Sequence, residues 1–538
     1  MKDGYMRTAL RHLGLVLAGG IMALAHVELL AADNSTGEEL INEQCLDCHK
    51  RQPDGSLRRL TDARRTPEGW DMTVGRMTQV HRIKLSPVER QTLVKYLADK
   101  YGLAPEEAGP WRYAIERRPE EVDFIEQPLV GEICARCHSY ARIGLQRRSE
   151  TEWRRLANFH IGQFTTTELQ SNNRAVNWWE IASQQIPPLL AQHYPSDSAT
   201  WKAWQQQAKM NPAGSWRVTG HRPGWGDYEG IATISAKEAD NYAVTLELNY
   251  ANGKTERGSG EAIVYTGFEW RGSVKLGDEE VRQVFTLSDG GTRLQGRWFL
   301  TRSDVIGADL RAAKIDGPAE VMAVTPGFVK AGKAAQVTIQ GVGLAGAISI
   351  DGGVTVTRIV ARSAEKIVVE VQAPKGSAAG LHSVRVGDVI GARMLAVYNK
   401  IDQVRIRPDP GLSRVGDNGG KLAAIPIQFE AVAYASGKDG KIGTADDVAI
   451  GVMPARWSID DLNPAAVAMR DKQFAGKIDA VGGLFMPGAA GPNKKRKFGT
   501  NNFGELKVIA EVEDGQRKVK GTGKFIVTAQ RWNDPPIR

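Results

Sequence analysis

The sequence predicts a multidomain α + β protein, in which a helical N-terminal domain precedes three antiparallel β domains. Apolar residues recur with the 3.6-residue period of helices up to about residue 211, and with the two-residue period of strands after it. A chain of 538 residues is also too long for one hydrophobic core, because a domain typically contains about 150 residues. Both observations favour several separately packed domains.

The composition is that of a folded protein, with 42% hydrophobic and 25% charged residues. The net charge of +8 is small beside 70 basic and 62 acidic side chains. The basic run Lys494–Lys497 lies between segments rich in glycine and proline, so we expect a solvated loop there. We expect no nucleic-acid partner.

Residues 1–32 are expected to form a secretory signal peptide. Three basic residues precede the apolar run Leu13–Ala25, which is too short to span a membrane comfortably and ends in small residues. We expect cleavage after Ala25 or after Ala32, export, and no membrane anchor after processing. An N-terminal anchor helix is the alternative.

The four cysteines fall in two C-x-x-C-H motifs, Cys45–His49 and Cys134–His138. This is the attachment signature of c-type haem. Thiols three residues apart share one helical face and reach both vinyl groups on one porphyrin edge, and the following histidine lies beneath the iron. Disulfides, a zinc ribbon and a redox C-x-x-C are the rivals, but none of these requires the histidines. We expect two covalently bound haem c groups, attached through Cys45, Cys48, Cys134 and Cys137, with His49 and His138 as axial ligands.

An internal repeat predicts the second axial ligands. The segments GWDMTVGRM, which ends at Met77, and EWRRLANFH, which ends at His160, align on their tryptophans. Each ligand candidate follows its tryptophan by seven residues, or two helical turns, and so shares its face. We expect Met77 and His160 to complete the two iron sites. His81 and His193 are their rivals, and a core methionine and a buried histidine are the structural alternatives.

The repeat divides the helical domain, residues 33–211, into two units at 33–102 and 125–211. Residues 86–97 begin with a capping sequence and carry an apolar face, as expected of the closing helix of a small cytochrome c unit. The segment 103–123 is rich in Pro, Glu and Arg, and we expect it to link the units.

The different sixth ligands predict a direction of electron flow. Thioether donation favours reduced iron, so a His/Met haem tends to have a higher potential than a bis-His haem. We expect electrons to pass from the second site (His138/His160) to the first (His49/Met77).

The remaining three-fifths of the chain is predicted to be β structure. Alternating residues such as those of 242–250, followed by an Asn-Gly turn, indicate an antiparallel barrel over 212–317. We expect immunoglobulin-like β-sandwiches over 318–398 and 399–538.

No catalytic motif stands out in the β domains, which are expected to be scaffold or docking surface. Asp439, Asp446 and Asp447 lie in a segment that loosely resembles a calcium loop but lacks the spacing and final glutamate of an EF-hand. A plain turn is the expected structure. We therefore expect no catalytic residue in this chain.

The order of domains and the two motifs, Cys45-x-x-Cys48-His49 and Cys134-x-x-Cys137-His138, resemble the alpha subunit of quinohaemoprotein amine dehydrogenases. The resemblance implies a periplasmic heterotrimer, with a β-propeller-type subunit and a small subunit that carries a tryptophylquinone. Primary amines would be oxidised at that quinone, outside this chain. This chain would then pass electrons to a soluble carrier such as azurin or a cytochrome c.

Two other classes of function compete with this interpretation. A self-contained dihaem enzyme, such as a peroxidase, needs a haem with an open or displaceable sixth position. A haem-bearing adhesion or ligand-binding protein would be isolated without partner subunits.

Overall fold

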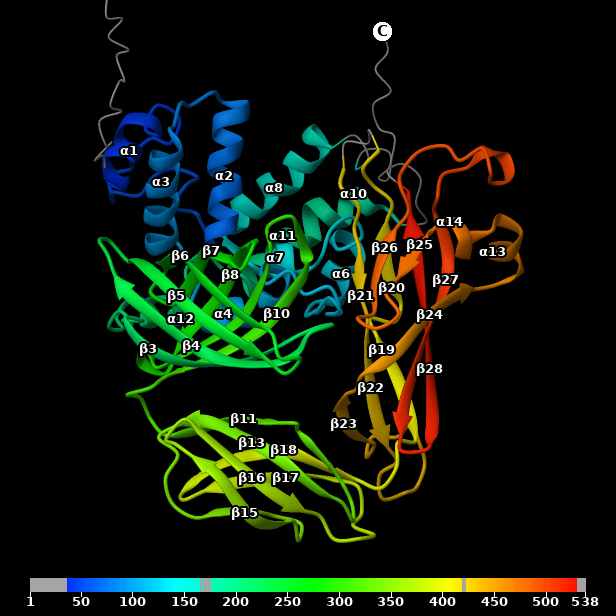
Figure 1. Ribbon diagram of the computed structural model, residues 1–538. Helices are drawn as coiled ribbons and strands as arrows, with labels where there is room; N and C mark the ends of the chain where they lie inside the picture. The colour runs from blue at the N-terminus through cyan, green and yellow to red at the C-terminus, as the bar shows by residue number, and fades with distance from the viewer. Residues whose placement is uncertain (1–35, 165–166, 168–175, 419–421, 530–538) are drawn as a thin grey trace, which may run out of the picture.

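The computed structural model describes residues 36–164, 167, 176–418 and 422–529. A helical domain is followed by an eight-stranded barrel and two further β domains (Figure 1), which confirms the predicted fold class. The expected signal peptide lies outside the described residues. Within the described ranges, no helix has both the length and the apolar character needed to cross a membrane.

The helical domain contains two units built from corresponding elements. Each has a helix before its attachment motif, a short strand, a 14-residue helix and a closing helix. These elements are α1 (Gly37–Gln44), β1 (Ala63–Arg65), α2 (Pro67–Val80) and α3 (Pro87–Lys100) in the first unit, and α6 (Pro128–Cys134), β2 (Gln146–Arg148), α8 (Glu150–Gln163) and α11 (Ile186–His193) in the second. Shorter helical segments are α4 (Pro105–Ala108), η1 (Gly109–Trp111), α5 (Arg112–Ile115), α7 (Ala141–Gly144), α10 (Trp178–Glu180), η2 (Ile181–Gln185) and α12 (Ala199–Gln205).

The long helices begin where their sequences cap them. The side-chain oxygens of Thr66 and Ser149 accept backbone N–H groups in the first turns of α2 and α8. Ser86 and Glu89 form a capping box at the start of α3, as the sequence predicts.

The repeated tryptophans make the same contacts in both units. Trp70 Nε1 donates to the carbonyl of Tyr101 at 2.9 Å, and Trp153 Nε1 donates to that of Tyr194 at 3.4 Å. Both indoles are at least 97% buried in the cores of their units. Truncating either to alanine should cost about 3–5 kcal/mol. The tryptophans therefore fix α2 and α8 in their units.

Strands β1 and β2 join the two units, because they pair with each other antiparallel around Arg64 and Arg147. The segment 103–123, expected to be a linker, is more structured than that: it carries α4, η1 and α5, and it places Glu107 between the units in a buried position. Its polar composition reflects ion pairing there as well as exposure to solvent.

The barrel lies beneath the helical domain (Figure 1) and closes through the pairing of β10 with β3. Its strands are β3 (Gly214–Arg222), β4 (Gly226–Ala236), β5 (Asn241–Tyr250), β6 (Thr255–Tyr265), β7 (Glu269–Leu276), β8 (Glu279–Ser288), β9 (Arg293–Leu300) and β10 (Ser303–Lys314), with the turn η3 (Asp289–Gly291) before β9. Polar contacts fix it to the helices: Asp99 accepts the backbone N–H of Thr266 at 2.7 Å, and Lys95 pairs with Asp240 at 2.9 Å.

The next domain consists of two four-stranded sheets around an aliphatic core. One sheet has the order β11 (Glu320–Thr325), β13 (Ala334–Val342), β16 (Lys366–Gln372) and β15 (Thr355–Arg362). The other has the order β12 (Phe328–Lys330), β18 (Val389–Tyr398), β17 (Gly380–Val386) and β14 (Ile348–Ile350). The β12–β18 pair is parallel, which departs from the otherwise antiparallel prediction.

The C-terminal domain contains three sheets. They are β19 (Gln403–Arg407), β22 (Glu430–Ala435) and β23 (Val448–Val452); then β20 (Gly411–Arg414), β28 (Arg517–Thr528), β27 (Gly504–Asp514) and β24 (Ala455–Asp461); then β21 (Ile427–Gln428), β26 (Leu484–Pro487) and β25 (Gly476–Ile478). The β20–β28 pair is parallel. The short helical segments are α13 (Pro464–Met469), α14 (Asp471–Phe474) and η4 (Lys497–Gly499).

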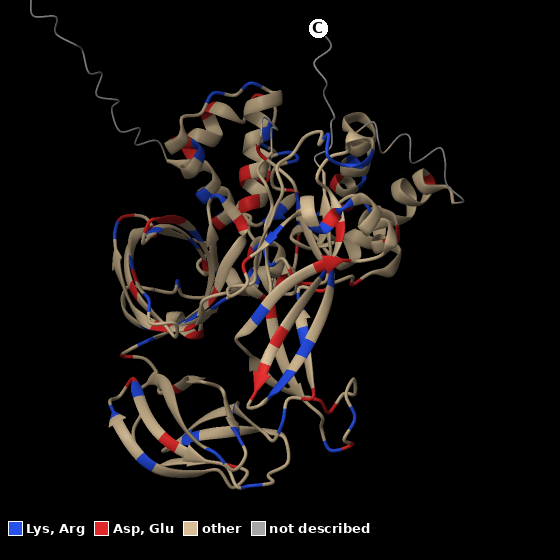
Figure 2. Ribbon diagram, turned by 45° about the vertical axis from the view of Figure 1, so that its right-hand side comes forward, with Lys and Arg blue, Asp and Glu red and all other residues tan. Residues whose placement is uncertain are grey.

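Charges of both signs are interspersed over all four domains (Figure 2). The basic run at 494–497 is only partly the solvated loop that we expected. Its three lysines are exposed, but Arg496 is buried and pairs with Asp471. The prediction was wrong for that residue because its carboxylate partner lies 25 positions away in the sequence.

Candidate haem-binding sites

The first attachment motif forms a turn at the end of α1. Cys45 is the last cap residue of that helix, and its carbonyl accepts the backbone N–H of His49 at 2.9 Å. The ring Nδ1 of His49 lies 3.0 Å from the carbonyl of Arg58. A carbonyl only accepts, so Nδ1 carries the proton and Nε2 keeps a free lone pair. This is the arrangement that orients a metal-ligating histidine.

The second motif repeats this geometry at the end of α6. The Nδ1 of His138 donates to the carbonyl of Ser139 at 2.9 Å, which again leaves Nε2 free. Burial lowers the pKa of His138, and the charge of Arg142 adds to this effect, although the Ser139 contact opposes it. The neutral imidazole is the form that binds a metal.

No disulfide joins any of the four cysteines in the part of the chain that the structure describes, which disfavours the disulfide alternative. Burial raises the pKa of Cys45 to about 11 and that of Cys134 to about 12. Thiol redox chemistry needs a thiolate, which these values disfavour. Within the described ranges, no group of three or more His, Cys, Asp or Glu side chains is arranged to hold a metal ion. Addition of the thiols to haem vinyl groups is the chemistry that fits best.

His160 lies opposite His138. Its Nδ1 donates to the carbonyl of Leu156 at 2.7 Å, so its Nε2 is also free. The two ring centres are 6.4 Å apart. A metal bonded to both Nε2 atoms at about 2 Å would separate the ring centres by about 6 Å. The pair is therefore spaced to hold one iron between them.

The rival His193 is engaged differently. Its Nδ1 lies 3.2 Å from the side-chain amide nitrogen of Gln127, which donates to it. Its proton must then lie on Nε2, and the ring has no free lone pair. His193 is also exposed at the end of α11. The structure therefore favours His160 as the sixth ligand of the second site.

Met77 and His81 differ in their positions on α2. Met77 is half-buried on the face that carries Trp70 and Val74, whereas His81 is exposed and caps the end of the helix. This placement favours Met77 over His81 as the sixth ligand of the first site.

A cavity of about 1950 Å³ contains the second site. His138, His160 and both cysteines of the second motif line it, together with apolar side chains from α8, η2 and α11. It continues between the helical domain, the barrel and residues 423–425. The apolar side chains that surround His138 and His160 suit the flat, mostly apolar ring of a porphyrin, and polar and charged side chains line the rest of the cavity.

Helix α2 contributes to this cavity from its other face. Met72, Arg76 and Gln79 line the cavity, and the helical period places them opposite Trp70, Val74 and Met77. One helix therefore has the first unit's core on one side and the second site's cavity on the other.

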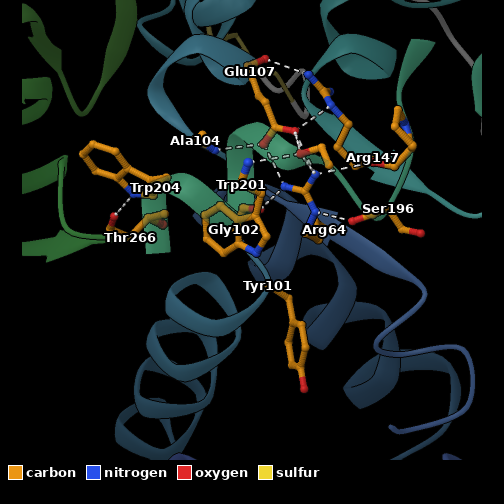
Figure 3. Close-up of polar contacts among 12 residues, drawn as sticks. Arg64, Tyr101, Gly102, Ala104, Glu107, Arg147, Ser196, Trp201, Trp204 and Thr266 are labelled. Carbon is orange, nitrogen blue, oxygen red and sulfur yellow. Dashed lines mark hydrogen bonds and ion pairs between the residues drawn. The ribbon is translucent and has the colours of Figure 1, made fainter. Parts of the chain in front are cut away.

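Sequence reasoning missed a charged group at the junction of the units. Glu107 lies between Arg64 and Arg147 (Figure 3). Its oxygens accept from Arg64 at 2.7 and 2.8 Å, and its carboxylate lies 3.4 Å from Arg147 Nε. The pair Arg64 and Arg147 occupies equivalent positions of the repeat, six residues before each tryptophan, and this would have been the signal for a shared partner.

The aspartates of the loop at 438–447 form hydrogen bonds and an ion pair with groups of the protein itself. Asp446 accepts from Thr444 at 2.8 Å, and Asp447 accepts from the Gly443 backbone at 2.9 Å and pairs with Arg405. These contacts fit the expected turn.

Four family models match the chain in succession. They are described as Quinohemoprotein amine dehydrogenase A, alpha subunit, haem binding (residues 35–201), and as domains II (209–315), III (318–399) and IV (404–537) of the quinohemoprotein amine dehydrogenase alpha subunit. A comparison with the curated proteins gave no match.

Similar solved structures cover only parts of the chain. A redesigned β-barrel, mFAP1 bound to DFHBI, shows 15% identity over 19% of this chain and 91% of its own, with a TM-score of 0.17. The titin domains z1z2 in complex with telethonin show 13% identity over 40% and 96%, with a TM-score of 0.13. The Bacteroides ovatus protein SGBP-B in complex with a mixed-linkage heptasaccharide shows 13% identity over 60% and 66%, with a TM-score of 0.18. Such low TM-scores carry no argument about function.

Proposed function

The chain belongs to the alpha-subunit family of quinohaemoprotein amine dehydrogenases, and we propose that it is the two-haem electron-transfer subunit of such an enzyme. It takes electrons from a protein-derived quinone in a partner subunit and passes them to a soluble carrier such as azurin or a cytochrome c, in the periplasm. The amine is oxidised in the partner, so this chain contributes no catalytic residue.

One observation carries the proposal: two attachment motifs occur on corresponding elements of a duplicated helical unit, and each is followed by a ligand helix. Cys45 and Cys48 hold the first haem, and Cys134 and Cys137 hold the second. When bound, each haem supplies a one-electron redox couple. The protein's own contribution is to attach, ligate and surround these groups.

Histidine orientation supports six-coordinate iron in the second site. His49, His138 and His160 all direct Nδ1 to a backbone carbonyl, and the rings of His138 and His160 face each other at 6.4 Å. With both axial positions held, neither water nor peroxide has a free position at that iron. This disfavours the peroxidase alternative.

The position of helix α2 between the two haem sites supports electron transfer over a short distance. Met77 and the wall of the second cavity lie on opposite faces of this helix, and a helix with its side chains is about 10–12 Å across. We propose that the lower potential belongs to the bis-His site, so that electrons move from the second site to the first.

The decisive experiment isolates the native complex from the periplasmic fraction and measures its haem content and spectra. We expect two haems per copy of this chain, a quinone in a separate subunit, and reduction of both haems on addition of a primary amine. Replacement of Cys134 and Cys137 by serine should remove one haem, and the same change at Cys45 and Cys48 should remove the other.

Two results would contradict the subunit proposal, and a third would favour the peroxidase-like alternative. A chain that purifies without partners, or one whose haems stay oxidised in the presence of amine, would contradict the subunit proposal. A high-spin resting haem in the electron paramagnetic resonance spectrum would favour the peroxidase-like alternative.

A further inference from the structure

Four of the ten arginines that line the cavity of His138 and His160 lie close enough together to interact electrostatically. Arg65 and Arg76 come from the first unit, and Arg142 and Arg148 from the second. Arg65 and Arg148 are equivalent residues of the repeat, each five residues before its tryptophan. The cluster therefore gathers basic groups from both units in one cavity.

None of these four guanidinium groups forms an ion pair with a carboxylate within the part of the chain that the structure describes. Of the four, Arg148 is buried, Arg65 and Arg76 are half-buried and Arg142 is exposed. The buried Arg64 and Arg496, by contrast, pair with Glu107 and Asp471. Buried charges are normally paired, because leaving them unpaired costs several kcal/mol. The positive charge of the cluster is therefore not neutralised by an ion pair, and an anion bound there would neutralise it.

Aromatic rings hold the cluster in place. The guanidinium of Arg65 lies 4.8 Å from the ring centre of Trp70, and that of Arg148 lies 5.5 Å from Trp153. Arg76 lies 5.2 Å from the ring of Phe159, the neighbour of His160. Stacking fixes the planes of the guanidinium groups and leaves N–H donors at their edges for an acceptor.

The arginines also repel one another. Burial lowers the pKa of Arg65, and the charges of Arg148 and Arg76 lower it further. Burial likewise lowers the pKa of Arg148 to about 10, and the charges of Arg76 and Arg59 add to this effect. The carboxylate of Glu152 partly offsets the lowering of the pKa for both Arg65 and Arg148. An anion bound among them would relieve this repulsion.

The covalent geometry identifies that anion. A haem attached through its vinyl edge to Cys134 and Cys137 would carry its two propionate carboxylates on the side of the porphyrin away from the cysteines. The cavity lined by both cysteines is also lined by the four arginines, which could receive these carboxylates. We propose that Arg65, Arg76, Arg142 and Arg148 form the binding site for the propionates of the second haem. The inference rests on the proposed haem at this motif.

The cluster has a consequence for electron transfer. Positive charge near an iron favours its reduced form, so the arginines raise the potential of the bis-His site and oppose the lowering effect of its second imidazole. They also keep the propionates ionised, because an opposite charge favours the charged form of a carboxylic acid.

The test compares Arg76→Gln and Arg142→Gln holoproteins with wild type in redox titrations at several pH values, with the bis-His haem identified by electron paramagnetic resonance. In each variant we expect the reduced-to-oxidised ratio at fixed electrode potential to fall about tenfold, or about 59 mV. The potential should also become pH-dependent near neutrality as a propionate titrates. Arg76→Lys should restore most of the potential.

Arg154→Gln is the matched control, because Arg154 lies on α8 but pairs with Glu150 and does not line the cavity. If haem is attached at the second motif but both variants keep the wild-type potential at every pH, the propionate site is wrong and the proposed function stands. If the wild-type potential shifts on addition of inorganic phosphate at constant ionic strength, the cluster holds a free anion instead. Absence of haem from the second motif would refute the proposed function itself.

Discussion

Replacement of Glu107 by glutamine should strongly destabilise the helical domain. Glu107 is only 8% exposed, and it is the carboxylate shared by Arg64 and Arg147, which are 3% and 5% exposed. Glutamine keeps the shape of the side chain but removes its charge, and so leaves two buried arginines without a counter-ion. Removing one partner of a buried ion pair costs about 3–5 kcal/mol.

This loss can be converted to a melting temperature. For a domain of this size, each kcal/mol lowers the midpoint by roughly 2–4 °C, so we expect Glu107→Gln to lower it by roughly 6–20 °C. The haem absorbance reports the helical domain separately from the β domains, whose independent unfolding would complicate a global signal. Thermal scans followed in the Soret band therefore provide the assay.

The pH dependence gives a second readout for the same residue. Burial alone would raise the pKa of Glu107, but the hydrogen bond from Arg64 and the charges of Arg147 and Arg64 outweigh it and lower the pKa below its ordinary 4.5. The stabilisation is therefore present above about pH 4.5 and is lost as the pH falls through the lower value in the folded protein. Glu107→Gln should remove this acid sensitivity.

A matched surface variant is the control. Glu150 pairs with Arg154 on the exposed side of α8, and such a pair contributes about 0–1 kcal/mol. Glu150→Gln should shift the midpoint by less than about 4 °C. A Glu107→Gln protein that melts within the same small range would refute the reasoning, since it would show that the buried arginines need no carboxylate.

Three further predictions follow from the candidate sites and the domain contacts. His160→Ala should convert the second haem from low-spin to high-spin, visible by electron paramagnetic resonance, whereas His193→Ala should not; a low-spin His160→Ala protein would contradict the ligand assignment. Met77→His should lower the potential of the first haem in a redox titration, because imidazole replaces a thioether, and an unchanged potential would exclude Met77 as a ligand. His221 contacts the carboxylates of Asp227 and Glu430, each at 2.6 Å. Burial alone would lower the pKa of His221, but the two carboxylates raise it to about 10. The contact between the barrel and the C-terminal domain should therefore weaken as the pH rises from about 6.5 towards 10. Limited proteolysis across this range should show increasing cleavage in wild type and little pH dependence in His221→Gln.

Local patterns predicted much of the structure. The capping sequence at Ser86 and the alternation that forms β5 depend on neighbouring residues, and both predictions are confirmed. The two attachment motifs are also local patterns, and the attachment of haem through them stays a prediction. The spacing of Met77 and His160 from their tryptophans also comes from a local period. These features need no knowledge of distant contacts.

The remaining features depend on contacts between distant segments. The pairing of β1 with β2 joins residues 81 to 85 positions apart in equivalent copies, and Glu107 contacts an arginine of each strand. The burial of Arg496 follows from Asp471. The choice between His160 and His193 required the hydrogen bonds at each Nδ1, which a sequence does not display.

The antiparallel pairing of β1 with β2 is the kind of contact that two identical subunits make across a twofold axis, in which each strand meets its own copy. Two separate copies of one gene product would have to carry the same residue at both ligand positions. Because both halves are encoded in one chain, one can carry Met77 and the other His160. A single chain can therefore keep the twofold geometry of this junction while the ligand positions in its two halves differ.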